Sequence, residues 1–152
     1  MNHYVFALVA GVGASITLGL LFMVESNVEG AALVMAPFGA TAVLVFGLPQ
    51  SPLAQPKNVI FGHLITASIG IVFSQYVGVT PMSLAIATGL GVTCMLVSKT
   101  THPPAGANPI LIMLAGHGWL FLVTPVLIGS IVIVLVSKGL QKVQQYILKS
   151  EC

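Results

Sequence analysis

The sequence has very little charge. Only 5% of its 152 residues are charged, five being lysine and three glutamate, whereas 57% are hydrophobic. Soluble domains carry about a quarter charged residues, and no soluble fold can bury so large an apolar fraction. Long uncharged runs are unavoidable at this composition, and helical runs of about 20 residues cross a bilayer. The sequence therefore predicts an all-α polytopic membrane protein.

Residues that usually carry catalysis or hold cofactors are also scarce. The apolar segments contain no Asp or Glu, the histidines are irregularly spaced, and there is no HExxH, P-loop or nucleophile-elbow pattern. Cys94 and Cys152 provide neither a disulfide framework nor metal-ligand spacing. The lysines are scattered and form no surface for nucleic acid. We expect no enzyme activity, no cofactor, no metal and no nucleic-acid partner.

Six apolar segments follow one another along the chain, at residues 4–24, 31–48, 59–76, 82–97, 105–116 and 119–136. If all six cross the bilayer, with Glu25 and Glu29 outside, every lysine and both termini lie in the cytoplasm, as the positive-inside rule favours. The fifth segment is short and can instead form a re-entrant loop. The sequence thus leaves four to six crossings open.

The N-terminal apolar run is longer than the core of a usual signal peptide and lacks a basic region before it. We interpret it as the first membrane helix, and the few residues that precede it favour the bacterial inner (plasma) membrane over an organelle. The chain is expected to be one transmembrane domain, 1–152, with repeat halves at about 1–77 and 78–138. Residues 139–152 are predicted to form an amphipathic cytoplasmic tail.

Two segments share the pattern Pro-x-Gly-Ala-Thr/Asn, at Pro37 to Thr41 and at Pro104 to Asn108. Proline has no N–H to donate, so a chain broken in this way inside hydrocarbon must line a cavity or be buried in protein. With six crossings the two copies are antiparallel, which predicts an inverted repeat of short broken helices. Transporters with such repeats hold their solute where the broken helices meet. The alternative is that the glycines only allow tight helix packing.

The candidate binding residues come from these two motifs and from the polar loops before the third and fifth segments. Helix N-termini favour anions, and glycine lets a solute approach the backbone closely. The predicted substrate-binding residues are Gly39, Ala40, Thr41, His102, Gly106, Ala107 and Asn108. Ser51, Gln55, Lys57, Asn58 and His63 are predicted to form a vestibule. For His102 and His63 a purely structural hydrogen-bonding role remains an alternative.

The strings APFGATAVLVFGLPQSPLAQPKNVIFGH, from Ala36 to His63, and THPPAGANPILI, from Thr101 to Ile112, resemble the HPP family of integral membrane proteins. The family is described as having four membrane helices, and members from plastids and cyanobacteria resemble nitrite transporters. The resemblance therefore implies a small anion, nitrite first, as the substrate. By matching motif positions, it also implies functional roles for Gly39, Ala40, Thr41, Gln55, Asn58, His63, His102, Gly106 and Asn108.

The function predicted from the sequence is a passive or gradient-driven transporter or channel for nitrite or a similar small anion. The anion would bind between the two antiparallel broken helices, and the protein would form a homo-oligomer in the bilayer. One alternative is a structural or signalling membrane protein that transports nothing, in which the repeat merely packs helices. The other alternative is an intramembrane enzyme that uses the histidines. Such an enzyme would need a carboxylate, and the apolar segments contain none.

Overall fold

In the computed structural model, residues 2–28 and 32–150 are described, with side chains described as far as Lys142. The described residues form helices joined by short loops and contain no strand. Three helices are long and apolar enough to cross a membrane, at His3–Asn27, Pro56–Val77 and Leu122–Lys142. The predicted all-α membrane bundle is thus confirmed.

The long helices form the frame of the bundle. They are α1 (His3–Asn27), α3 (Pro56–Val72) continued by the π-helical turns of η3 (Phe73–Val77), α4 (Pro81–Val97), and η5 (Leu122–Leu127) continued by α6 (Ile128–Ser150). Both α3 and α4 begin with a proline in the first turn, where the missing N–H needs no partner. The side chain of Thr80 caps α4 by accepting a hydrogen bond from the Ser83 amide.

Two of the six predicted segments contain only short helices. The first is α2 (Pro37–Ala42) with η1 (Val43–Gly47), and the second is the 3₁₀ helix η4 (Pro103–Ala107) with α5 (Asn108–Ala115). The six residues of α2 and five of η1 rise about 16 Å, roughly half of a bilayer's hydrocarbon core. The second and fifth segments are therefore half-length helices, in agreement with the prediction of broken helices.

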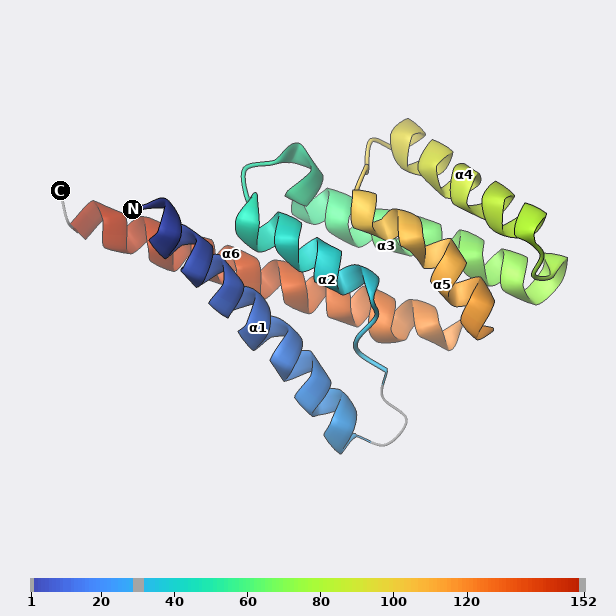
Figure 1. The fold of residues 1–152 in the computed structure, drawn as a ribbon, viewed down its shortest axis with the longest axis horizontal. Helices are drawn as coiled ribbons and strands as arrows, with labels where there is room; N and C mark the ends of the chain where they lie inside the picture. The colour runs from blue at the N-terminus through green and yellow to red at the C-terminus, as the bar shows by residue number, and fades with distance from the viewer. Residues whose placement is uncertain (1, 29–31, 151–152) are drawn as a thin grey trace.

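The two half-length helices begin close together and run apart. Figure 1 shows α2 and α5 starting near the middle of the bundle and extending toward opposite ends, with α3 and α6 alongside. η4 contacts α2 and α3, while α5 packs between α3 and α4. The starts of the two half-length segments thus meet near the middle of the bundle.

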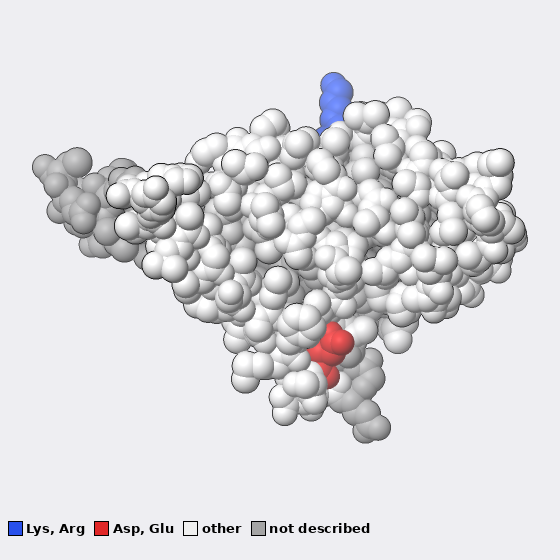
Figure 2. Space-filling model, viewed as in Figure 1, with Lys and Arg blue, Asp and Glu red and all other residues white. Residues whose placement is uncertain are grey.

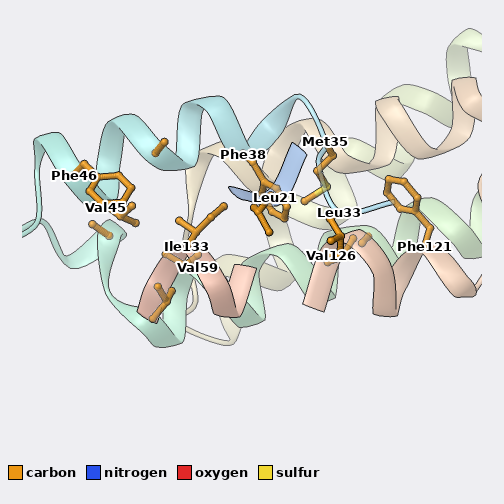
Figure 3. Packing of buried hydrophobic residues seen from close by; sticks show 14 of the residues in the cluster. Leu21, Leu33, Met35, Phe38, Val45, Phe46, Val59, Phe121, Val126 and Ile133 are labelled. Atoms are coloured by element: carbon orange, nitrogen blue, oxygen red, sulfur yellow. The ribbon is translucent and has the colours of Figure 1, made fainter. Parts of the chain in front are cut away.

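The apolar core lies mainly between α2, α6 and the flanking helices (Figure 3). Phe38 is fully buried, as are Ile133 and Val126 on the last helix. The Phe38 ring packs directly on Gly129, where a Cβ would overlap the ring. Glycine at this position lets α6 approach α2 closely enough to bury the aromatic side chain.

Charged groups lie at the edges of the bundle. In Figure 2 a lysine and an acidic group appear at opposite edges, with uncharged surface between them. Many large apolar side chains of the protein are exposed, among them Leu8, Leu114 and Leu135, as expected for helices that face lipid. Glu25 also serves the fold, because its carboxylate accepts hydrogen bonds from the amides of Leu33 and Val34, both at 2.9 Å.

Some predictions fall outside the described part of the chain. Glu29, Ala31 and Cys152 are not described, nor are the side chains of residues 143–150, which include Lys149. The backbone of α6 continues as one helix from Ile128 to Ser150. The tail predicted at 139–152 therefore begins as an extension of the last helix.

Candidate functional site

Four polar side chains from distant parts of the sequence meet where the half-length helices begin. Thr41 comes from α2, His63 from α3, His102 from the residue before η4, and Asn108 from the start of α5. All four are fully buried, with 0% of their surface exposed. We call this group the polar cluster. Each member was among the residues predicted from the sequence.

The Thr41 hydroxyl joins the two histidines. Its Oγ1 lies 2.8 Å from Nε2 of His63 and 3.0 Å from Nε2 of His102. The same oxygen lies 3.1 Å from the carbonyl oxygen of Pro37, one turn earlier in α2. The two imidazole rings meet edge to face, with their centroids 5.0 Å apart.

Asn108 binds the other side of His63. One N–H of its Nδ2 donates to the Thr66 hydroxyl at 2.9 Å, and the other is shared between the carbonyl oxygen and Nδ1 of His63, both at 3.1 Å. Thr41 and Asn108 occupy the fifth position of their respective Pro-x-Gly-Ala motifs. The matched ends of the two motifs therefore bind opposite nitrogens of one imidazole ring.

The hydrogen bonds fix the tautomer of each histidine. Nδ1 of His102 lies 2.8 Å from the carbonyl oxygen of Leu53, which can only accept, so Nδ1 carries the proton and neutral Nε2 accepts from Thr41. Nε2 of His63 must then donate to the Thr41 oxygen, which leaves Nδ1 of His63 to accept from Asn108. These hydrogen bonds form a series that runs from Asn108 through His63, Thr41 and His102 to Leu53. In each bond the donor is on the Asn108 side and the acceptor on the Leu53 side.

His102 lies in the connection between α4 and η4, outside the three long helices. Burial lowers the pKa of His102 below its ordinary value, and the hydrogen bond to the Leu53 carbonyl opposes this shift. This direction favours the neutral imidazole, which is the form taken in the donor and acceptor order above.

Close backbone packing positions the two histidines against each other. A Cβ on Gly62, the residue before His63, would lie 2.9 Å from Cβ of His102 and 3.0 Å from the carbonyl oxygen of Thr100. Only glycine fits there without movement. The two prolines after His102 begin η4 and hold the residue before them in an extended conformation, which aims the ring back toward α3.

The small residues of the motifs lie on the other side of the half-length helices. Gly39, Ala40 and Ala107 are exposed and Gly106 is partly exposed. An added Cβ at Gly39 or Gly106 would meet nothing within 4 Å. Ala40 and Ala107 help line a shallow hollow of about 720 Å³ whose remaining lining, including Pro37, Pro104 and Ile110, is also apolar. The structure therefore separates these residues from the polar cluster.

The predicted vestibule residues mostly serve their own loops. Ser51 accepts from the Leu53 amide at 3.2 Å, and Gln55 donates to the carbonyls of Pro49 and Ser51 at 3.2 and 3.0 Å. Their bonds fix the segment that presents the Leu53 carbonyl to His102.

The remaining two vestibule residues lie at the start of α3. Asn58 donates to the Thr101 carbonyl at 2.9 Å, which ties α3 to the loop before η4. Lys57 is exposed. Asn58 thus helps to position His102 from outside the polar cluster.

The backbone amides at the start of the half-length helices are not free, which differs from the amide-based anion site that the motifs suggested. Phe38 and Gly39 donate to the carbonyls of Met35 and Ala36, and the Ala105 amide donates to the His102 carbonyl. The prolines at the first helical positions have no N–H at all. The amides of Phe38, Gly39 and Ala105 are therefore already used in backbone hydrogen bonds.

Two partners of the polar cluster were missed by the sequence analysis. Thr66 follows His63 by three residues, so both lie on one face of α3, and this spacing was the available signal. The Leu53 carbonyl gave no signal, because any residue supplies one. Among the described residues, no group of three or more His, Cys, Asp or Glu side chains could hold a metal ion.

Comparison with known proteins agrees with the motifs. The sequence pattern of the HPP transmembrane region matches residues 2–147. The chain belongs to the HPP family. Two transmembrane proteins of Dictyostelium discoideum are 33% and 32% identical to this HPP protein over 109 and 111 residues. These matches cover 66% and 68% of the chain but 35% and 39% of the relatives, so the chain spans little more than a third of their length. No solved structure matches this HPP protein.

Proposed function

We propose that this HPP protein is a membrane transporter for a small inorganic anion, with nitrite as the first candidate, and that the solute passes where α2 and η4 begin. The observation that carries the proposal is the link from Thr41 and Asn108 to opposite nitrogens of His63. Broken helices inside hydrocarbon are tolerated only in protein or beside a cavity, and transporters place solute sites where such helices meet.

A gated transporter fits the burial better than a permanently open channel. The four side chains of the polar cluster have no exposed surface, so a solute reaches them only after the half-length helices move. The outward faces of these helices have room beside them, because an added Cβ at Gly39 or Gly106 would meet nothing within 4 Å. The apolar hollow beside them also suits coverage by a second copy, so we propose a homo-oligomer.

The orientation in the membrane is part of the proposal. Lys57 begins α3 and Lys99 follows α4, and the bond from Asn58 to Thr101 places these ends of the two helices together. Lysine-rich ends favour the cytoplasmic side, so both termini are proposed to be cytoplasmic. A bacterial plasma membrane stays a prediction, since the two relatives come from Dictyostelium.

The test is nitrite flux into liposomes that contain the purified protein, with empty liposomes as the baseline. In a background with Cys94→Ala and Cys152→Ala, the double variant Ala40→Cys/Ala107→Cys is bridged by a bifunctional methanethiosulfonate reagent. Both alanines line the hollow between the half-length helices, so the bridge should prevent the two helices from moving relative to each other. Flux should fall to the baseline and return when the bridge is reduced.

Two controls make the outcome specific. Ala85→Cys on the exposed face of α4, paired with Ala107→Cys and treated in the same way, should leave flux unchanged. Recovery after reduction shows that the bridged protein is still folded. No flux above empty liposomes from correctly folded wild-type protein would refute the proposal and favour a structural or signalling role.

A further inference from the structure

The polar cluster has no spare hydrogen-bond donor. Nε2 of His63 donates to Thr41, Nδ1 of His102 donates to Leu53, and the amide of Asn108 donates to His63 and Thr66. The Thr66 hydroxyl donates in turn to the Gly62 carbonyl at 2.8 Å. The neutral cluster therefore offers a bare anion neither a free donor nor a positive charge.

Acceptors, in contrast, are left over. The Oδ1 atom of Asn108 is buried and has no hydrogen-bond partner. The Pro37 carbonyl lies 3.1 Å from the Thr41 hydroxyl and has a second lone pair that Thr41 does not use while it donates to His102. A buried acceptor without any donor, such as Asn108 Oδ1, is uncommon and points to a missing hydrogen-bond donor.

One added proton fits the cluster without any movement of heavy atoms. If it binds the lone pair on Nε2 of His102, the new N–H donates to the Thr41 oxygen at 3.0 Å. The Thr41 hydroxyl then rotates and donates to the Pro37 carbonyl at 3.1 Å. The Thr41 oxygen accepts from both histidines with its two lone pairs, and no donor faces another donor.

The charge of this added proton has no counterpart in the surrounding helices. α2, η2, η4 and α5 carry no titratable side chain, and α3 contributes His63 to the contact with His102. The other titratable groups of these packed helices and of the loop before His102 are Lys57, Tyr76, Cys94, Lys99, Lys138, Lys142, Tyr146 and Lys149. The carboxylates Glu25 and Glu29 come before α2 in the sequence, and Glu25 accepts from the amides of Leu33 and Val34. None of the groups on the packed helices is a carboxylate, so a protonated cluster is a cation that an anion would neutralise.

From this geometry we infer that the polar cluster binds a proton on His102 together with the transported anion, so that the protein moves the two as an electroneutral pair. The inference rests on the proposed anion transport and deepens it. When the proton passes from Nε2 of His102 to the anion, the cluster returns to its neutral form and Asn108 Oδ1 supplies an acceptor for the O–H of the protonated solute. A small weak acid, taken up as its anion and one proton, is the class of substrate that suits these groups.

The experiment measures nitrite uptake and external pH together in liposomes that contain the wild-type protein, with the membrane potential clamped by potassium and valinomycin. Empty liposomes correct for nitrous acid that crosses the lipid by itself. We expect one proton taken up per nitrite, no change in rate with the clamped potential, and about tenfold accumulation of nitrite per unit of pH gradient.

The outcomes separate this inference from the proposed function. Nitrite flux that follows the clamped potential and carries no proton would overturn the proton coupling and leave anion transport standing. Absence of protein-dependent nitrite flux would remove both.

A variant pair tests the role of His102 directly. In His102→Asn the amide can keep the bond to Leu53 but not the proton, so uptake should lose its dependence on the pH gradient. His117→Asn, a histidine that stacks on Phe121 with ring centroids 3.9 Å apart, should behave as the wild type. Unchanged proton coupling in folded His102→Asn would exclude His102 as the proton site.

¹⁵N spectra of labelled wild-type protein provide a readout without transport. Added nitrite should raise the fraction of His102 that carries protons on both ring nitrogens, and an unchanged fraction at saturating nitrite would contradict the inference.

Discussion

Replacement of Thr41 by valine removes the one hydroxyl that joins the two buried histidines while nearly preserving the shape of the side chain. His63 Nε2–H and His102 Nε2 both lose their partner, at present 2.8 and 3.0 Å away. In a water-soluble protein two such buried groups would cost about 2 to 6 kcal/mol. Hydrogen bonds between membrane helices average about 0.6 and reach about 1.7 kcal/mol. We therefore expect Thr41→Val to lower the free energy of unfolding by about 1 to 3 kcal/mol.

The matched control is Thr17→Val. Thr17 on α1 is also fully buried, but its hydroxyl donates only to the Gly13 carbonyl of the same helix, at 2.7 Å. Its loss should change stability by less than about 0.5 kcal/mol. Unfolding in mixed micelles with increasing dodecyl sulfate, followed by circular dichroism, measures both variants. Equal stability of Thr41→Val and Thr17→Val would refute the view that the Thr41 hydroxyl holds the half-length helices to α3.

Three further predictions follow from the same geometry. ¹⁵N spectra at neutral pH should show His63 protonated on Nε2 and His102 on Nδ1, and the opposite tautomers would disprove the donor order. Gly62→Ala should destabilise by about 1 to 3 kcal/mol because its Cβ meets His102, whereas Gly89→Ala, with nothing within 4 Å, should be neutral or stabilising in the same unfolding assay. Glu25→Ala should speed hydrogen exchange of the two amides that the carboxylate holds, while Glu25→Gln, which keeps an acceptor oxygen, should change exchange less.

Several features could be predicted from the sequence because they depend on local chemistry. Composition alone requires helices in a membrane, because the backbone must satisfy its own hydrogen bonds in hydrocarbon. Pro37 and Pro104 mark the breaks, since proline cannot donate within a helix. The polar residues at the ends of the two motifs, Thr41 and Asn108, were thereby predicted as site residues, as was His102 before its prolines, and the structure brings these three side chains together.

Other features depend on how distant segments pack. His63 was predicted only as part of a vestibule, but contacts from α2 and α5 place it at the centre of the polar cluster. The motif residues Gly39 and Gly106 were grouped with Thr41 and Asn108, yet the helical turn points them to the opposite side. Which face of a short helix meets its neighbours is not a local property of the sequence.

The hydrogen bonding of the backbone amides also separates what is local in the sequence from what depends on packing. The sequence by itself determined a membrane-embedded helical protein with two proline-broken segments, because these follow from hydrophobicity and from the missing N–H of proline. Tertiary structure decided that the first-turn amides are already bonded and that side chains from four segments form the polar cluster. Directional hydrogen bonds require atoms within about 3 Å, and only the packed chain brings residues 22 to 61 positions apart to that distance.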